Sequence, residues 1–526
     1  MKVGLAQIDT RIGDFEGNRR RILEAAREAG ARGAEFLALP ELALTGYPPR
    51  DLLFDPAFVE RATAVTAEIA RDLASGPPTV LGAPWPSGRS TPNHPGLLNA
   101  ALLLAGGRVY AFRGKRLLPA YDVFHEPRWF VPDDARGPVE VNGMRVGLLV
   151  CEDLWDEGYA CHPGPALRSE GAALLVAIAA SPFRAGILAQ RLRHARRVGG
   201  LLVYVNAAGA NDELVFDGGS FALGSDGALR ALLPRFREAV EIVDLERTRA
   251  AATADAELGS DQELYDALVC GLAGFVAKNG LPRVFLGLSG GVDSALVACI
   301  AADAVGPARV VALALPSRHS DARSTQVARE LAASLGIGFA ELSIEPLYLA
   351  AQGSLAALLD GSPAAGVTDE NLQARLRALV LAAHVNRRGG LLLNTSNKTE
   401  LSLGYGTLYG DLAGTLSVIG DLTKTEVYSV ARWCSAHRHS IPGFILERAP
   451  SAELRPGQVD PFDYETLSPL LESLVQGRGA SGGPDAERWR LALRAAEHKR
   501  FQHGVILKLS ETAFGTGRLV PITRAW

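Results

Sequence analysis

Short apolar runs alternate with amphipathic helical stretches through the first half of the chain. Seven runs rich in β-branched or apolar residues are typical of buried strands and lie at 2–8, 35–40, 79–84, 97–106, 145–150, 173–180 and 201–209. The helical spacing of apolar residues predicts helices at 18–30 and 57–74. Strands and helices joined by short connections predict a layered α/β domain in which helices cover a sheet.

The pattern changes after residue 246. The stretch TRAAATADAELGSDQ is polar and rich in small residues, as in a linker, and Ser260 with Glu263 forms a capping-box pattern for a new helix. We therefore place a boundary near residue 255, between domains at 1–250 and 256–526. Further apolar runs at 284–288, 309–317 and 389–397 alternate with helical segments, which predicts a doubly wound parallel sheet. The Gly-rich segment 476–484 predicts a mobile surface loop.

Composition narrows the class of protein. Hydrophobic residues make up 48% and charged residues 21% of the 526 residues, as in an ordinary globular protein. The net charge of −4 lacks the basic excess of a protein that binds nucleic acid. The N-terminus turns polar before a signal-peptide apolar region is complete, and no apolar run approaches the ~20 residues of a membrane-spanning helix. We expect a cytoplasmic protein that binds neither nucleic acid nor membrane.

The five cysteines are widely spaced and form no CxxC pair, so neither a disulfide framework nor a zinc site is indicated. Cys151 directly follows the apolar run RVGLLV, and Glu41 and Lys115 also stand at the ends of predicted strands. Taken singly, each has a structural explanation as a rim or packing residue. Together they supply the nucleophile, the general base and the positive group for an oxyanion that a thiol needs to hydrolyse an amide.

The segments LALPELALTGYPPRDLL, RGKRLLPAYDVFHEPRWF and VCEDLW resemble the glutaminase branch of the nitrilase superfamily. The resemblance covers nearly the whole first half and implies a nitrilase-like αββα sandwich. It implies that Cys151 forms a thioester, that Glu41 is the general base and that Lys115 stabilises the oxyanion. It also implies a glutamine site with Glu126 as a supporting carboxylate, whose residues are Tyr47, Tyr121, Glu126, Glu152 and Ser181.

One position departs from that family. The family usually has a basic residue six positions after the serine of SPF, where this sequence has Ile187, and Arg184 is near but out of register. This departure concerns one glutamine contact and leaves the cysteine, glutamate and lysine untouched. The basic run from Arg191 to Arg197 predicts a solvated helix face.

The segment GLSGGVDS follows a predicted strand and opens the next helix. Backbone N–H groups freed by a glycine turn at a helix N-terminus bind anions, and Ser289 and Ser294 add hydroxyl donors, so a phosphate site is predicted. The loop lacks the GK[ST] ending of a Walker A motif. It resembles the loop of the N-type ATP pyrophosphatases, which cleave ATP between the α- and β-phosphates and leave an adenylated substrate.

The segments TDENLQARLRALVLAAHVN, LLLNTSNKTELSLGY, LYGDLAGTLSVIGDLTKTEVY and APSAELRPGQ resemble the NAD⁺ synthetases in order and spacing. The resemblance implies an ATP site made of Gly287, Leu288, Ser289, Gly290, Gly291, Val292, Asp293, Ser294 and Thr395. At deamido-NAD⁺ it implies Asn371, Glu400 and Lys508, with Arg375, Asn397, Lys398, Asp411 and Lys424 as further pocket residues. Asp293 and Glu400 resemble ligands of Mg²⁺. The segment KRFQHGVILK, which contains Lys508, departs from the family because it lacks a common proline.

The two resemblances together imply a fused enzyme that converts ATP, deamido-NAD⁺ and glutamine into NAD⁺, AMP, pyrophosphate and glutamate. They further imply Mg²⁺, a homo-oligomer paired through the synthetase domains and, as a hypothesis, an internal tunnel for ammonia. Two alternatives are an amidotransferase with another adenylated acceptor and an amidase with a nucleotide-sensing module. The segments NTSNKTE and SAELRPGQ argue against the first, and the intact SGGxDS loop argues against the second.

Overall fold

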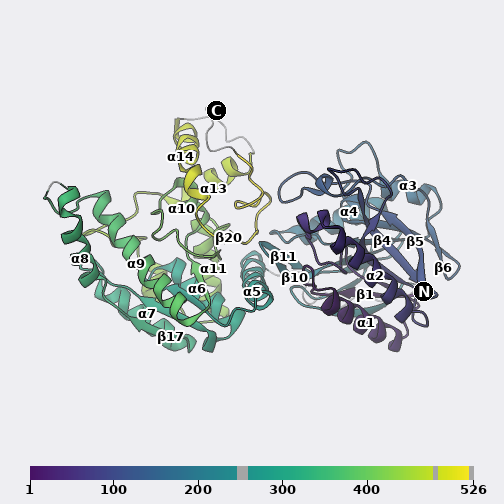
Figure 1. The fold of residues 1–526 in the computed structure, drawn as a ribbon, viewed down its shortest axis with the longest axis horizontal. Helices are drawn as coiled ribbons and strands as arrows, with labels where there is room; N and C mark the ends of the chain where they lie inside the picture. The colour runs from purple at the N-terminus through teal and green to yellow at the C-terminus, as the bar shows by residue number, and fades with distance from the viewer. Residues whose placement is uncertain (246–258, 360, 478–483, 521–526) are drawn as a thin grey trace. The chain divides into compact units, whose positions relative to one another are not determined.

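The chain forms two compact units, Met1–Leu258 and Gly259–Trp526 (Figure 1). The computed structural model describes residues 1–245, 259–359, 361–477 and 484–520. The predicted linker and the boundary near residue 255 fall at 246–258, outside the described residues, so the domain limits stay a prediction. None of the helices in the described ranges is long and apolar enough to cross a membrane.

The first unit contains two six-stranded sheets. The first has the order β14 (Ala239–Asp244), β1 (Lys2–Gln7), β2 (Phe36–Ala38), β3 (Thr79–Pro86), β4 (Leu97–Ala105), β5 (Arg108–Gly114). The second has the order β13 (Leu229–Leu232), β12 (Phe221–Leu223), β9 (Leu201–Asn206), β8 (Leu174–Ala179), β7 (Met144–Val150), β6 (Val139–Val141). A separate ribbon pairs β10 (Ala208–Asn211) with β11 (Leu214–Asp217). The helices are α1 (Phe15–Ala31), α2 (Pro56–Asp72), α3 (Pro163–Ser169) and α4 (Ile187–Val198), with short 3₁₀ turns η1 (Arg50–Phe54), η2 (Glu126–Arg128) and η3 (Cys151–Leu154).

Alternate residues of β4 show how the layers stack. Ala101 and Leu103 belong to the core between the two sheets, together with Leu148 of β7. Leu102 and Leu104 lie in the other cluster, under α1 and α2. Successive side chains of a strand point to opposite faces, so one strand serves both cores. Helices, two sheets and helices therefore form the predicted αββα sandwich, which is confirmed.

The second unit contains one six-stranded sheet in which every pair is parallel. Its order is β17 (Gly338–Glu341), β16 (Val310–Ala314), β15 (Val284–Gly287), β18 (Leu391–Asn394), β19 (Leu416–Ser417), β20 (Val505–Ile506). In chain order this is the doubly wound arrangement, and the prediction of such a sheet is confirmed. The strand order reverses between β15 and β18, where ligands bind in such sheets.

Helices flank this sheet and connect its strands. They are α5 (Ser260–Lys278), α6 (Val292–Val305), α7 (Ala322–Leu335), α8 (Glu345–Leu355), α9 (Val367–Arg388), α10 (Lys398–Leu403), α11 (Lys424–His437), α12 (Gly443–Glu447), α13 (Tyr464–Val475) and α14 (Pro484–Arg500), with 3₁₀ turns η4 (Pro307–Arg309) and η5 (Ala356–Leu359). The loop predicted at 476–484 is described only at its ends, because residues 478–483 lie outside the described ranges.

Helix starts differ from the predictions in both units. Helix α1 starts three residues before the predicted position, because the Asp14 side chain accepts the N–H of Gly17 and caps it. The predicted capping box at Ser260 is wrong. Gly259 is the N-cap of α5 and Ser260 is already helical, so no side chain caps this helix. Glu263 instead lies in the first turn, where the helix dipole favours a carboxylate.

Two candidate active sites

Cys151 stands on a tight turn directly after β7. Its backbone has φ 42°, which is rare for a residue with a side chain, and its side chain is buried. The carboxylate of Asp153 accepts the backbone N–H groups of Val150, Arg116 and Leu117 at 2.9–3.1 Å. The strained turn is thereby tied to the segment that follows Lys115, and such strained strand-to-helix turns present nucleophiles.

The structure brings Glu41, Lys115 and Glu126 together. The Lys115 ammonium donates to Glu41 Oε1 at 3.0 Å and to Glu126 Oε1 at 2.7 Å, and all three side chains are almost fully buried. Asn99 of β4 donates from Nδ2 to Glu41 Oε1 at 2.6 Å. The other oxygen of Glu41 accepts the N–H of Ala180 at 2.7 Å. Glu41 is thus held in one orientation by three donors.

Burial and mutual charge set the protonation of this cluster. Burial raises the pKa of the Cys151 thiol well above its usual value, and the Glu41 carboxylate raises it further. Burial alone would lower the pKa of Lys115, but the charges of Glu126 and Glu41 raise it well above its usual value. Burial also raises the pKa of Glu126 to about 7 against the opposing effect of Lys115. The resting thiol therefore keeps its proton, and a neighbouring base has to remove it.

The residues implied at glutamine surround this cluster. Glu152 accepts hydrogen bonds from Tyr121 at 3.0 Å and from Tyr159 at 2.9 Å. Tyr47 donates to Glu126 Oε1 at 3.2 Å. Tyr121 is 52% exposed whereas Glu152 is 4% exposed, so this pair runs from the surface to the residue beside Cys151. Ser181 is buried two residues beyond the end of β8.

The prediction that the run from Arg191 to Arg197 is a solvated face is wrong for Arg191. Its side chain is fully buried and donates to Asp217 and Ser181, whereas Arg193, Arg196 and Arg197 are exposed. The helical period places position 191 on the inner face of α4, which a count of charges does not reveal. Ile187 lies on the same buried face, and Arg184 donates to Gln190.

The predicted phosphate loop joins β15 to α6. Gly290 has φ 81°, and a Cβ on it would lie 2.3 Å from the carbonyl oxygen of Ser324. Ser294 Oγ accepts the N–H of Ser289 at 3.2 Å, and Ser289 Oγ accepts the N–H of Gly291 at 3.3 Å. Only glycine fits at position 290, and the loop is folded by its own hydroxyls at a helix N-terminus.

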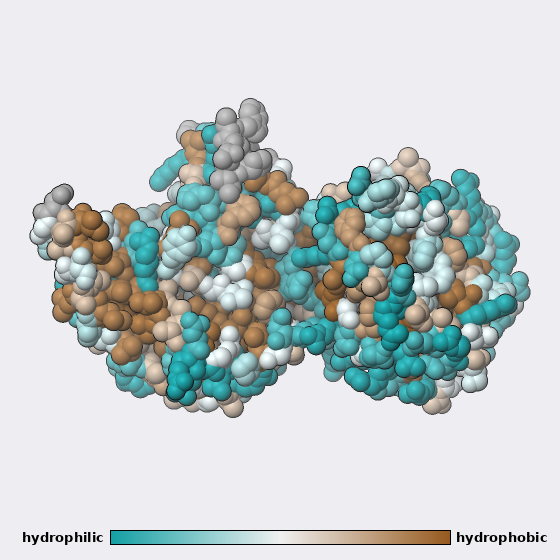
Figure 2. All heavy atoms as spheres, in the orientation of Figure 1, coloured by the Kyte–Doolittle hydropathy of each residue, from teal (hydrophilic) through white to brown (hydrophobic). Residues whose placement is uncertain are grey.

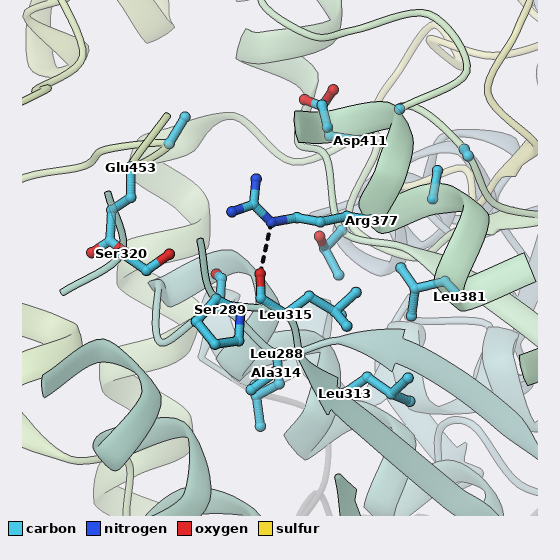
Figure 3. Close-up of a pocket in the computed structure, with 18 of the residues that line it drawn as sticks. Leu288, Ser289, Leu313, Ala314, Leu315, Ser320, Arg377, Leu381, Asp411 and Glu453 are labelled. Carbon is cyan, nitrogen blue, oxygen red and sulfur yellow. Dashed lines mark hydrogen bonds between the residues drawn. The ribbon is translucent and has the colours of Figure 1, made fainter. Parts of the chain in front are cut away.

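Two cavities meet at this loop. The larger is about 240 Å³ and lies at the carboxyl ends of β15, β16 and β18, with Leu288, Leu313 and Leu381 on its apolar side (Figure 3). The second is about 190 Å³ and is lined by Asp293 in the first turn of α6 and by Glu400 of α10. Ser289, Thr395, Asp411, Ala452 and Glu453 line both cavities. An apolar chamber next to a polar, phosphate-binding one is a suitable shape for a nucleotide.

A buried lysine separates the two carboxylates implied at Mg²⁺. Lys424 Nζ lies 2.6 Å from Asp293 Oδ2 and 3.2 Å from Glu400 Oε1, and Asn397 Nδ2 donates to Asp293 Oδ1 at 2.9 Å. Burial raises the pKa of Glu400 to about 7 against the opposing charge of Lys424. No group of three or more metal-ligating side chains occurs in the part of the chain that the structure describes.

Comparison with known proteins agrees with this geometry. The carbon-nitrogen hydrolase family model matches residues 2–255 and the NAD synthase family model matches residues 264–485. A glutamine-dependent NAD(+) synthetase from Rhodobacter capsulatus is 39% identical over 100% of this chain and 98% of its own length. The chain belongs to the glutamine-dependent NAD(+) synthetases. The corresponding synthetase from Synechocystis is 36% identical over 100% of this chain and 99% of its own length. The solved structure of the Acinetobacter baumannii glutamine-dependent NAD⁺ synthetase in complex with ADP is 29% identical, with a TM-score of 0.78, over 100% of this chain and 99% of that one.

Several residues implied at deamido-NAD⁺ in this NAD(+) synthetase lie outside the linings of both cavities. Asn371 accepts from Thr407, Arg375 donates to the Leu408 carbonyl, and Lys508 donates to two backbone carbonyls. Lys398 is 1% exposed, and its ammonium lies 2.9 Å from Asp421 and 2.8 Å from Glu472. These ion pairs occupy the Lys398 ammonium within the protein, and its contact with deamido-NAD⁺ stays a prediction. By contrast Thr395, Glu400, Asp411 and Lys424 all line a cavity, and their contacts with substrates stay a prediction.

Four polar residues of the two sites were missed by the sequence reasoning. Asn99 interrupts the apolar run LLNAALLLA, and a lone amide in a buried strand is the signal that marks it. Arg377 lines the larger cavity, where it donates from Nε to the Leu315 carbonyl at 2.9 Å and lies between Asp411 and Glu453 (Figure 3). Burial lowers its pKa to about 10. Arg448 and Glu453 line the second cavity, and both sit within or beside the quoted segment APSAELRPGQ.

Proposed function

We propose that this chain makes NAD⁺ from deamido-NAD⁺, ATP and glutamine and releases AMP, pyrophosphate and glutamate. One observation carries the proposal. A buried cysteine, glutamate and lysine cluster and a phosphate loop with adjoining cavities occur in one chain, which is similar over its whole length to glutamine-dependent NAD(+) synthetases. An amidase paired with a nucleotide site is the combination that a glutamine-driven ligase needs.

In the first unit, Glu41 takes the proton of Cys151, and the thiolate attacks the amide carbon of glutamine. Lys115 stabilises the oxyanion, because its ammonium is buried and remains charged. Glu41 returns the proton to the departing ammonia, which leaves a thioester, and then activates the water that releases glutamate. Asn99, Ala180 and Lys115 hold Glu41 in place for both proton transfers.

In the second unit, the loop from Gly287 to Ser294 binds the phosphates of ATP, and the larger cavity takes the adenosine. The nicotinate carboxylate attacks the α-phosphorus and displaces pyrophosphate, and ammonia converts the resulting adenylate to the amide with release of AMP. The ADP complex of the Acinetobacter baumannii relative supports a nucleotide at this fold. Arg377 and Arg448 contribute positive charge to the two cavity walls.

The carboxylates of Asp293 and Glu400 fit Mg²⁺. This ion is usually held by one or two carboxylates plus substrate phosphates rather than by a complete protein cage, and both side chains line the cavity beside the phosphate loop. Bound there, it would neutralise phosphate charge. Lys424, which now bridges the two carboxylates, would orient them toward the phosphates.

We also propose a cytoplasmic homo-oligomer that pairs through the second unit. Large apolar side chains are exposed on α8, the η5 turn and α9, namely Leu347, Leu349, Leu358, Val367 and Leu379. Brown residues gather over this part of the unit in Figure 2. Exposed apolar patches of this kind mark protein interfaces. Because α9 also carries Asn371 and Arg375, a second copy bound there would explain why these residues lie outside the cavities of one copy.

A product analysis tests the proposed reaction. The purified chain is incubated with Mg-ATP and deamido-NAD⁺, with either glutamine or ammonium, and AMP, ADP and NAD⁺ are resolved. AMP and NAD⁺ are expected with both donors. The Cys151→Ala variant should lose synthesis from glutamine and keep synthesis from ammonium. Glutamate release without AMP and NAD⁺ would overturn the proposed acceptor, and loss of ammonium-driven synthesis in Cys151→Ala would overturn the division of labour.

A further inference from the structure

The guanidinium of Arg191 makes an unusual set of contacts inside the first unit. Its side chain and that of Asp217 are both fully buried, and Nη1 donates to Asp217 Oδ1 at 2.8 Å. Its other hydrogen bonds go to Ser181, and its guanidinium also lies 6.0 Å from the ring centre of Tyr204. Nη2 donates to the Ser181 carbonyl at 2.8 Å and to the hydroxyl at 3.2 Å, and Nε donates to the same hydroxyl at 3.3 Å. One arginine therefore holds the hydroxyl of this serine and shares its carbonyl with Asn206, which also accepts the serine N–H.

These contacts decide what the Ser181 hydroxyl can do. A hydroxyl has two lone pairs and one proton, and here two N–H groups of Arg191 take the lone pairs. The hydroxyl is then left to act as a donor, toward an acceptor oxygen, and the buried Tyr204 phenol beside it is one acceptor with which a substrate oxygen would compete. The preceding residue, Ala180, donates its N–H to Glu41 Oε2 at 2.7 Å. Arg191 and Asn206 thus hold the short segment that carries both Ser181 and a support of Glu41, and Arg191 is the one of the two that binds the hydroxyl.

The charge of the cluster formed by Arg191, Asp217 and Arg235 also favours an acceptor oxygen next to Ser181. Asp217 is shared by two arginines, since Arg235 lies 3.0 Å from its second oxygen, so the buried group carries net positive charge. Burial by itself would lower the pKa of Arg191. The charge of Asp217 is the main effect that raises this pKa above its usual value, and Cys151 contributes to the same effect. The positive end of this cluster faces Ser181. An anionic or carbonyl oxygen beyond the serine would be stabilised by it.

We propose that Arg191 is a positioning residue of the amidase site that presents the Ser181 hydroxyl as a hydrogen-bond donor to an acceptor oxygen of the substrate. The identity of that substrate as glutamine, whose α-carboxylate is such an acceptor, rests on the proposed function. The alternative is that Arg191 serves only to neutralise Asp217. The chain offers a matched control for that alternative, because Arg235 binds the other oxygen of the same carboxylate.

The test compares Arg191→Met with Arg235→Met in the full-length chain. In each variant Asp217 keeps one arginine, so a purely structural loss should be similar. Glutamate release is measured over a range of glutamine concentrations, with ammonium-driven NAD⁺ formation and thermal unfolding as checks on folding. Arg191→Met should raise KM for glutamine on the order of 10- to 100-fold, as expected when a hydrogen bond that involves a charged group is lost. Arg235→Met should leave KM within about threefold.

A double-mutant cycle with Ser181→Ala separates action through the serine from a general effect. If Arg191 acts through Ser181, the double variant should lose no more than the worse single variant. Arg191→Lys should keep the fold and still show the raised KM, because an ammonium lacks the fork that holds both groups of the serine. Equal KM changes in the Arg191 and Arg235 variants, or additive effects in the cycle, would overturn the inference. A wild-type chain that does not hydrolyse glutamine would instead overturn the proposed function.

Discussion

Substitution of Gly290 by alanine should disable the phosphate loop while leaving the first unit intact. The residue has φ 81°, a conformation that costs an L-residue about 1–2 kcal/mol. A Cβ there would also lie 2.3 Å from the carbonyl oxygen of Ser324 and 2.9 Å from its carbonyl carbon. The clash is with backbone, so it cannot be relieved by the rotation of a side chain.

The clash at Gly290→Ala should lower the rate of NAD⁺ formation. A carbon and an oxygen in contact lie about 3.0–3.5 Å apart, so the loop or the start of α7 has to move by about 1 Å. Ser324 resists that movement, because its hydroxyl donates to Glu453 at 2.6 Å and accepts from Arg448 at 2.6 Å. A displacement of about 1 Å in a reacting group costs on the order of 100-fold in rate. We therefore expect about a 100-fold loss of NAD⁺ formation with either nitrogen donor.

Gly306→Ala is the matched control. Gly306 ends the same helix with φ 84°, and a Cβ there meets nothing within 4 Å. It should lose about 1–3 kcal/mol of stability from backbone strain alone, because its ψ is 142°, and keep its synthetase activity. NAD⁺ and AMP formation from ammonium and glutamate release from glutamine without nucleotides are measured in both variants. The reasoning would be refuted if the NAD⁺-forming activity of Gly290→Ala were within a few-fold of that of Gly306→Ala. It would also be refuted if glutamate release by Gly290→Ala fell as much as its NAD⁺ formation.

Three further outcomes are expected. Asn99→Leu removes the donor 2.6 Å from Glu41, so kcat for glutamine hydrolysis should fall by about 10- to 100-fold with KM little changed; a normal kcat would mean that Glu41 does not need this donor. Burial raises the pKa of Glu126 from 4.5 to about 7, so the folded chain binds a proton in this window that the unfolded chain has lost. The unfolding free energy should rise as pH falls from 7 to 4.5, and Glu126→Gln should reduce that rise in denaturant titrations, with Glu400 and Asp153 contributing the remainder; an unchanged profile would contradict it. Lys398→Met leaves two carboxylates without their lysine and should lower stability by about 3–5 kcal/mol without raising KM for deamido-NAD⁺; a raised KM in the folded variant would return Lys398 to the substrate site.

The sequence by itself determined the central elements and located the loops that carry chemistry. The seven predicted strands of the first unit all form. Alternating or continuous apolar runs favour strands because each apolar face has to be buried against a core. The doubly wound sheet of the second unit also follows from local pattern, since its strands are short apolar runs between helices. The positions of Cys151 and of the glycine at 290 were also located from the local sequence. Contacts with distant residues explain their geometry, because Asp153 ties the Cys151 turn to Arg116 and Leu117, and the Ser324 carbonyl leaves room only for glycine at 290.

Only the tertiary structure decided which charged and polar side chains are buried and with which partners. Arg191 and Arg193 are two residues apart in one basic run, yet the first is fully buried and the second is 63% exposed, because one helical face meets the sheet and the other meets water. Glu41 follows β2, and Asn99 lies on β4, so Asn99 supports Glu41 only because β3 pairs with both strands in the sheet. Lys398 likewise binds carboxylates that are 23 and 74 residues away in the sequence. Burial makes an unpaired charge costly, so each such residue takes its role from the partner that folding brings to it.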